Sequence, residues 1–480
     1  MFCVRHSSRE ASDPPPSRDR AGGPFLNRRT TPAGLACLAL ITFCTLWRVF
    51  GGGQWLAVGV AVGAALLIAA ERNRIPRTLL LTAALLSCAS VLLLPFAAEP
   101  LQATARGVFL GGLLLSLMAS VALLGHCALR SAHVRSVGDY LHAQPGSRRY
   151  LGFTVASQVF SSMLSLAGAN VLFGMLSKEH ASPPGDEGLA SAITRGFSAA
   201  TFWSPMFGNM AILLAIYPSL RWIDVFPLGL VLAQFAILIG VLLHLRQPRP
   251  VTVPTVSAPA RPHIGRALLP LLSALGLFLA WLLTASAAFH VSVTAMIVLS
   301  APIAAWVMNT SMAPRGARRA VDGARAVAED VANLPTLAPE ATVLMAAGCA
   351  GTILASAFPQ RWAMLVGSGL SATPIFAISA LILAPMVMAL MGIHPVLTSV
   401  FLASTFSPQL LDLPPVVHFC AILTGWGLAA CLTPFSVLSL TASRFTGISP
   451  PRVSIAANWR FAVWCTALFT LVLAGLAESL

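Results

Sequence analysis

The sequence predicts an all-α polytopic membrane protein, and three observations support this fold class. The chain has 480 residues, of which 57% are hydrophobic and only 10% are charged, whereas a soluble protein of this size has about 25% charged residues. Its mean hydropathy is +0.80. Apolar runs of about 20 residues recur along the chain, and each can cross a hydrocarbon core of about 30 Å. The alternating segments of about 10 residues that are typical of a membrane β-barrel are not visible.

The charge and the motifs of the chain argue against two other functional classes. The formal net charge is +14, but the basic residues lie in short loops between apolar runs, where they orient a membrane protein, so no nucleic-acid partner is expected. The nine cysteines form no CxxC pair and no zinc spacing. The chain also has no P-loop, G-x-S-x-G, HExxH or dinucleotide fingerprint. We therefore predict that it is not an enzyme and that it uses no cofactor.

Two apolar runs differ from ordinary membrane spans. Residues 150–177 contain several serines and the sequence Gly168-Ala169-Asn170, and residues 365–404 are too long for one span and contain Gly392-Ile393-His394-Pro395. If both runs are re-entrant hairpins, the arginine-rich loops 129–149, 246–266 and 309–340 all lie in the cytoplasm, as the positive-inside rule requires. We expect about 11 transmembrane helices and two re-entrant hairpins in a bacterial inner membrane. The N-terminus is then cytoplasmic, and the C-terminus lies on the other side.

This topology divides the chain into six segments. Residues 1–32 are polar and arginine-rich and predict a disordered cytoplasmic tail. Residues 246–265 include a proline-rich stretch and predict a cytoplasmic linker between two halves. The other segments are the N-terminal scaffold helices (33–128), a first repeat core with hairpin and broken helix (129–245), further scaffold helices with an amphipathic cytoplasmic connector at 314–334 (266–340), and a second repeat core with hairpin and broken helix (341–480).

The two halves contain the same pattern of glycine, hydroxyl and proline residues. Residues 196–206 align with residues 425–435 at a constant offset of 229, which places Ser204-Pro205 over Thr433-Pro434. Residues 166–170 align with residues 390–394 at an offset of 224, which places Asn170 over His394. In each half the unusual run precedes the proline-broken span, and an odd number of crossings between the copies predicts inverted repeats. Paired interrupted segments of this kind mark the binding site of many transporters.

The chemistry of these breaks predicts a solute site. Proline removes a backbone donor and frees a carbonyl that lipid cannot satisfy. A half-helix that begins at the break presents N–H groups that favour an anion, and freed carbonyls beside side-chain oxygens suit Na⁺. The expected Na⁺ ligands lie near Asn170, Ser204 and Thr433, and His394 is a candidate proton carrier. The alternative is that the prolines only kink packed helices. The full set of predicted solute-binding residues is Gly168, Ala169, Asn170, Ser204, Pro205, Asn209, Gly392, His394, Pro395, Thr433, Pro434 and Ser436.

Several of these stretches resemble a known family. Residues 392–396, 427–438 and 446–449 resemble the G-I-x-P, G-x-x-T-P-P-x-G and G-I-S elements of the large membrane subunit of tripartite ATP-independent periplasmic (TRAP) transporters. Residues 194–197, 204–206 and 224–226 are similar to the first half of that subunit. The resemblance covers roughly residues 150–245 and 341–470. The chain departs from the family at Phe435, which replaces the second proline, and at Val437, which replaces the following glycine.

The resemblance implies the ion-transporter superfamily fold, with a dimerising scaffold and an elevator-like transport domain. It also implies a small membrane subunit and a periplasmic binding protein as partners. We therefore predict a homodimeric secondary transporter that moves a small organic anion, such as a carboxylate, across the lipid bilayer by symport with Na⁺ or H⁺. The alternative is a non-transporting membrane scaffold or accessory component of a cell-envelope system, in which the two breaks would be tightly packed.

Overall fold

The computed structural model describes residues 31–142, 144, 146–177, 187–246, 264–314 and 316–479. The predicted tail (1–32) and the predicted linker (246–265) therefore lie almost entirely outside the described residues. Within the described ranges every regular element is a helix, which confirms the predicted all-α class. Nine helices there are long and apolar enough to cross a membrane, or ten if a pair bent by 120° counts as one span. The expected number of about 11 is not reproduced, partly because several apolar helices are short or broken.

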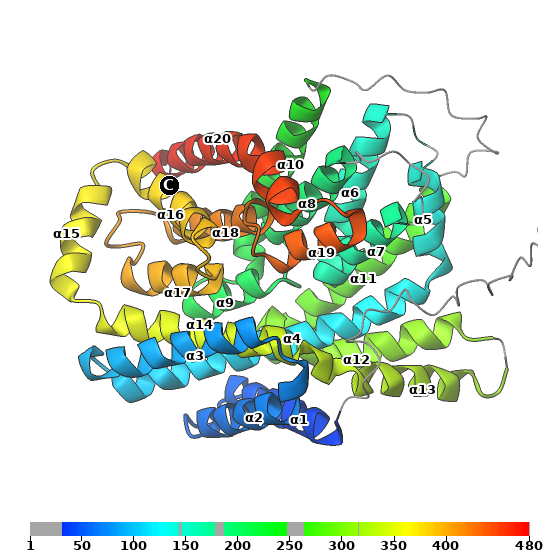
Figure 1. The fold of residues 1–480 in the computed structure, drawn as a ribbon, viewed down its shortest axis with the longest axis horizontal. Coiled ribbons are helices and arrows are strands. Elements are labelled where there is room, and N and C mark those ends of the chain that lie inside the picture. The colour runs from blue at the N-terminus through cyan, green and yellow to red at the C-terminus, as the bar shows by residue number, and fades with distance from the viewer. Residues whose placement is uncertain are drawn as a thin grey trace, which may run out of the picture.

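The N-terminal helices form one side of the molecule (Figure 1). Helices α1 (Pro32–Val49) and α2 (Leu56–Ala70) pack against each other as a pair at one edge. Beside them lies a layer that contains α3 (Arg77–Leu93), the 31-residue α4 (Pro100–Arg130) and α14 (Ala338–Ala357). Gly107 and Gly111 of α4 face Cys349 and Met345 of α14 so closely that a Cβ would collide with them. These glycines therefore allow the two long helices to touch along their length.

The first half continues with a hairpin, a broken helix and a closing helix. The elements are α5 (Ala132–His142), the hairpin α6 (Gly146–Leu164) and α7 (Leu166–Ser177), the broken helix α8 (Glu187–Thr201) and α9 (Gly208–Ile216), and α10 (Trp222–Leu245). Large apolar side chains fill the space between them, and Phe153, Phe160 and Phe202 are fully buried. This region and its counterpart in the second half share one hydrophobic core.

The second half presents the same order of elements. After α14 come α15 (Gln360–Leu370), the hairpin α16 (Pro374–Leu390) and α17 (Pro395–Thr405), the broken helix α18 (Pro415–Leu432) and α19 (Val437–Thr446), a π-helical turn (Arg452–Ala456) and α20 (Ala457–Ser479). Proline opens α16, α17 and α18 at the first helical position, where its missing N–H has no helical partner to lose. Ser436 caps α19, and Gly447 ends that helix with φ +71°.

The packing of the two halves also corresponds. Helix α6 packs on α8 as α16 packs on α18, α7 packs on α19 as α17 packs on α9, and the closing helices α10 and α20 pack on each other. This correspondence agrees with the repeat predicted from the sequence. The inverted orientation of the copies in the membrane stays a prediction.

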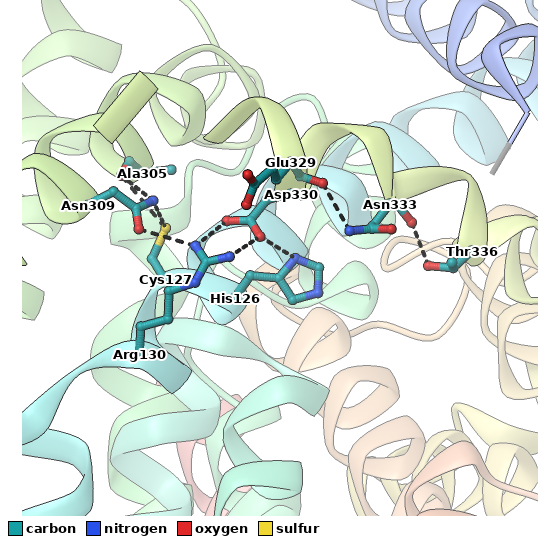
Figure 2. A network of polar contacts seen from close by, with 9 residues as sticks. All are labelled: His126, Cys127, Arg130, Ala305, Asn309, Glu329, Asp330, Asn333 and Thr336. Carbon is teal, nitrogen blue, oxygen red and sulfur yellow. Dashed lines mark hydrogen bonds and ion pairs between the residues drawn. The ribbon is translucent and has the colours of Figure 1, made fainter. Parts of the chain in front are cut away.

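Between the halves lie α11 (Ile264–Phe289), α12 (Val293–Met312) and the amphipathic connector α13 (Arg319–Ala332), a helix within the stretch where the sequence predicts one. Arg130 at the end of α4 donates hydrogen bonds of 2.8 and 2.7 Å to both carboxylate oxygens of Asp330 on α13 (Figure 2). The same guanidinium contacts the amide oxygen of Asn309 on α12 at 3.2 Å. His126 lies 3.7 Å from the Asp330 carboxylate, beyond hydrogen-bond length. This ion pair joins the connector α13 to the end of the 31-residue helix α4.

Candidate functional site

The first break lies between α8 and α9 and contains Ser204-Pro205, as the sequence predicts. The Ser204 hydroxyl donates to the backbone carbonyl of Ser162 at 2.6 Å, on the first arm of the α6–α7 hairpin. The same oxygen accepts from the Met206 N–H at 3.2 Å. The Asn209 amide donates to the Thr201 carbonyl at 3.3 Å, which is one of the carbonyls freed where α8 ends. The hydroxyl of Ser204 therefore joins the broken helix to the hairpin.

The second break lies between α18 and α19 and contains Thr433-Pro434. The Thr433 hydroxyl donates to the backbone carbonyl of Ala389 at 2.8 Å, on the first arm of the α16–α17 hairpin. It accepts from the Phe435 N–H at 3.3 Å. The Ser436 hydroxyl accepts from the Ser439 N–H at 3.0 Å and so caps α19. The Thr433 hydroxyl thus makes the same two bonds at the second break as the Ser204 hydroxyl makes at the first.

These bonds give the two halves equivalent geometry at the level of single atoms. The two carbonyl acceptors, Ser162 and Ala389, each lie three residues before a hairpin-tip residue with positive φ, Ser165 (φ 50°) and Gly392 (φ 86°). In addition, the Ser198 hydroxyl donates to the Gly427 carbonyl at 2.7 Å, and these two positions match at the offset of 229. A contact between equivalent positions is what a two-fold axis produces. The two broken helices therefore contact each other at positions that the sequence alignment pairs.

Two glycines of the repeat allow this close approach. A Cβ at Gly196 of α8 would lie 2.2 Å from the Thr154 carbonyl oxygen on α6. A Cβ at Gly425 of α18 would lie 2.4 Å from the Ile382 carbonyl oxygen on α16. In both halves the obstacle is backbone, which cannot move aside as a flexible side chain can. Glycine at this repeated position lets each broken helix pack directly on the first arm of its hairpin.

The hairpin tips differ from the sequence alignment. The first hairpin turns at Ser165, so Asn170 lies inside α7 and not at the tip. The second hairpin turns at Gly392, and His394 caps α17 by accepting the Val396 N–H on Nδ1 at 3.2 Å. The expected equivalence of Asn170 and His394 is therefore not found. The alignment at an offset of 224 misplaces the tip by three residues, because the short match contains only one identical glycine pair.

The other predicted hairpin residues have structural roles that the contacts reveal. A Cβ at Gly168 would lie 2.4 Å from the backbone carbon of Phe160, so this glycine lets the two arms of the first hairpin touch. Ala169 is fully buried beside it. Pro395 is the first residue of α17. These residues shape the hairpins and so position the polar groups of the site.

Both hairpins carry buried polar atoms with no hydrogen-bond partner among the described residues. In the first hairpin these include Asn170 Oδ1, predicted from the sequence, and Gln158 Nε2 and Ser161 Oγ, which the sequence analysis missed. In the second they are Thr398 Oγ1, Ser399 Oγ and Thr405 Oγ1, which were also missed. Most buried polar atoms in proteins have a partner, and an exception requires an explanation. Amide and hydroxyl residues within apolar hairpin arms were the available sequence signal.

The two breaks differ in their access to the surroundings. Ser204 and its neighbours Thr201 to Phe207 are buried. At the second break the Phe435 side chain is 63% exposed, and Pro434 and Ser436 are partly exposed. Phe435 is one of the two residues at which the sequence differs from the TRAP pattern that it resembles. The second break and the tip of the second hairpin therefore form the accessible side of the site.

A buried arginine supports the broken helix α8. The guanidinium of Arg195 is 2% exposed and donates to the Tyr150 hydroxyl (2.8 Å), the Asn458 amide oxygen (3.0 Å) and the Ala457 carbonyl (2.7 Å). It also lies over the Phe461 ring, 5.2 Å from the ring centroid. It thereby joins α8 and α6 of the first half to α20 of the second. Its position in residues 194–197, a stretch that resembles TRAP subunits, was the only sequence signal for it.

Comparisons with known proteins identify the fold. No family model matches the chain, and no curated protein sequence matches it. A solved structure, described as the Alcanivorax borkumensis YdaH transporter with an unusual topology, superposes with a TM-score of 0.54 at 16% sequence identity. The match covers 83% of this chain and 97% of that chain. The chain is therefore a multi-pass helical membrane protein with the fold of a solved transporter. The TRAP resemblance stays a prediction.

Proposed function

We propose that this chain is a secondary transporter that moves a small organic anion, such as a carboxylate, by symport with Na⁺ or H⁺. One observation carries the proposal. Each of the two broken helices is bonded to its hairpin by the same hydroxyl-to-carbonyl contact, from Ser204 to Ser162 and from Thr433 to Ala389. In many transporters the solute site within the membrane is formed by broken helices that meet at the interface between two repeats. The likeness to a solved transporter fold supports the same conclusion.

An organic anion fits the chemistry of this centre. Helix α9 begins at Gly208, and its N-cap Phe207 offers no side-chain acceptor. The Met210 N–H bonds to Asn209 Oδ1, which leaves the N–H groups of Gly208 and Asn209 for a ligand. The Asn209 amide uses one N–H for the Thr201 carbonyl and keeps a second N–H as a neutral donor beside them. Neutral donors and a half-helix dipole favour a carboxylate without fixing it as strongly as an arginine would.

Coupling to Na⁺ agrees with the oxygen atoms of the first hairpin. Asn170 Oδ1 and Ser161 Oγ are buried oxygens without a partner among the described residues. Carbonyl, amide and hydroxyl oxygens are the ligands that transporters offer to Na⁺ at unwound segments. The rival coupling ion is H⁺, for which His394 at the tip of the second hairpin is the proposed carrier.

The remaining features of the proposal concern the cell. We propose a bacterial inner-membrane location with the N-terminus in the cytoplasm. The scaffold helices α1–α4 and α11–α13 form the homodimer contact, and the two hairpins with their broken helices move against them as an elevator domain. A small membrane subunit and a periplasmic binding protein are the proposed partners if the transporter is of the TRAP type.

The test is ligand-dependent thermal stabilisation of the purified full-length protein. A panel of carboxylates is screened with and without Na⁺, and the unfolding midpoint is followed. We expect a subset of the panel to raise the midpoint of the parent protein, more strongly in the presence of the coupling ion. Ser204→Ala and Thr433→Val should each reduce the ligand-induced shift. Thr284→Val is the matched control, because this exposed hydroxyl on α11 bonds only to carbonyls of its own helix.

Two outcomes would contradict the proposal. If no carboxylate raises the thermal midpoint of the parent protein, either with Na⁺ or over a range of pH, the site does not bind an anion of this class. If Ser204→Ala and Thr433→Val keep the full shift, the ligand binds elsewhere and the breaks only shape packed helices. The first result would favour the membrane-scaffold alternative, and the second would move the solute site away from the breaks.

A further inference from the structure

A groove runs between the first arm of the second hairpin and the last helix of the chain. It lies between α16 and α20 and has a volume of about 590 Å³. Its walls are apolar side chains spaced by about one helical turn on both helices. They include Ile375, Leu383 and Leu390 of α16 and Trp459, Val463 and Leu471 of α20. A continuous apolar groove between two helices accommodates an extended hydrocarbon chain.

The few hydroxyl groups in the groove are turned towards protein partners. The Ser379 hydroxyl lies 3.4 Å from that of Thr470, and the Thr466 hydroxyl lies 3.7 Å from the Met386 sulfur. These contacts also close the floor of the groove by joining α16 to α20. The surface left for an occupant is therefore almost entirely hydrocarbon.

The surroundings of the groove identify its occupant as lipid. Helix α20 belongs to a candidate membrane span, Arg452–Ser479, and α16 forms with α15 a bent pair that is together long and apolar enough for a span. The outer residues of the groove are open to the surroundings, with Val463 57% and Leu471 62% exposed. In a bilayer such side chains face acyl chains, and the groove extends that contact inward.

The charge at one end of the groove selects the headgroup. The Arg460 guanidinium lies 5.2 Å from the centroid of the Trp459 ring, which itself lines the groove. Arg460 is exposed and forms no ion pair within the part of the chain that the structure describes. Tryptophan favours the headgroup region of a bilayer, and an arginine there binds phosphate in a fixed geometry.

We propose that the α16–α20 groove is a binding site for an anionic phospholipid, with one acyl chain in the groove and the phosphate on Arg460. The end of the groove near Trp459 is lined by Leu390 and Leu432. These residues are the direct neighbours of Ala389 and Thr433, which form the hairpin-to-break bond. An acyl chain in this position supports the second hairpin from its lipid side, so the bound lipid stabilises the accessible half of the central site. This inference does not depend on which solute is transported.

The experiment compares two lipids on the full-length protein. Protein delipidated in detergent is mixed with palmitoyl-oleoyl phosphatidylglycerol or with phosphatidylcholine of the same chains. Bound lipid is counted by native mass spectrometry, and the thermal midpoint is recorded. We expect the parent to retain phosphatidylglycerol about fivefold more strongly than phosphatidylcholine, since one arginine near a membrane surface contributes about 1 kcal/mol to anionic-lipid binding. The midpoint should rise with phosphatidylglycerol.

Two variants separate the headgroup from the chain. Arg460→Gln should bind both lipids equally, because the charge is lost and the groove remains. Val463→Trp should lose both lipids, because the indole occupies the groove. Leu277→Trp, at an exposed site on α11, is the control and should behave as the parent does. The proposal is wrong if the parent binds both lipids equally, or if Val463→Trp retains lipid at the parent's level. It is also wrong if a carboxylate displaces the lipid, since the groove would then be part of the solute path.

Discussion

Replacing Arg195 with methionine should destabilise the protein, because the guanidinium joins three helices around the broken helix α8. The side chain is 2% exposed and donates to Tyr150, Asn458, Ala457 and the Gly240 carbonyl. No carboxylate pairs with it in the ranges that the structure describes. All of its stabilisation therefore comes from neutral acceptors and from the Phe461 ring.

The size of the effect follows from two opposing contributions. Methionine leaves several buried acceptors without a donor, and each costs about 1–3 kcal/mol. The substitution also removes the unfavourable free energy of burying the guanidinium charge, which offsets part of this loss of stability. We expect a net loss of roughly 3–5 kcal/mol, which lowers the thermal midpoint by roughly 3–5 °C in a chain of 480 residues. Arg195→Lys should lose about half as much, because an ammonium keeps the charge but cannot reach all four acceptors in the geometry of a planar guanidinium.

The unfolding of this region can be followed through its own thiols. Cys420, Cys431 and Cys465 are fully buried in the same core, so a thiol-reactive fluorophore reports their exposure on heating once exposed thiols have been blocked. Arg361→Met is the control, since this arginine is exposed on α15. If Arg195→Met unfolds at or above the parent's midpoint, the cost of burying the charge exceeds the value of its bonds, and the argument fails.

Two further predictions concern packing outside the central site. Asp330→Asn should lower the thermal midpoint, with a loss of roughly 1–3 kcal/mol of stability, because it removes the charged acceptor of Arg130. The Arg130 side chain is 42% exposed and that of Asp330 is 6% exposed. Additive effects in a double-substitution cycle with Arg130→Gln would contradict this prediction. Gly425→Ala should cost about 1–3 kcal/mol, because the new Cβ would lie 2.4 Å from the Ile382 carbonyl oxygen. Gly475→Ala, where nothing lies within 4 Å, should leave the thermal midpoint unchanged or slightly higher, and equal effects at the two glycines would refute the packing argument.

Much of the fold was predictable because the membrane leaves few choices. Within lipid every backbone N–H and carbonyl must find a partner, so long apolar segments become helices. Interruptions are then marked by the residues that cannot continue a helix. The structure ends α8 before Ser204-Pro205 and α18 before Thr433-Pro434, and it turns the second hairpin at Gly392. The amphipathic connector was visible for the same reason, since charged and apolar positions alternate with the period of a helix.

The number of spans and the first hairpin tip were not predictable in the same way. Helix α2 has 15 residues, and α8 and α9 are two short helices separated by the first break. The number of apolar runs in the sequence therefore did not equal the number of helices long enough to cross a membrane. The first hairpin turns at Ser165 with a single residue at φ 50°. The sequence does not distinguish Ser165 from the other serines of this hairpin as the turn residue. Its positive φ is imposed by the packing of the two arms, because a non-glycine residue rarely adopts that conformation by itself.

By itself the sequence determined that this protein is a helical membrane protein with two interrupted segments in each half, because hydropathy, glycine and proline act on the chain locally. Tertiary structure alone decided which atoms meet. Ser204 finds a carbonyl 42 residues away, Thr433 finds one 44 residues away, and Ser198 meets Gly427 at a distance of 229 residues in the chain. The partners of a hydroxyl group in lipid depend on the approach of distant helices, which one-dimensional patterns do not encode. The hairpin oxygens that have no partner among the residues described by the structure, and hence the proposed ion site, became visible only once their surroundings were known.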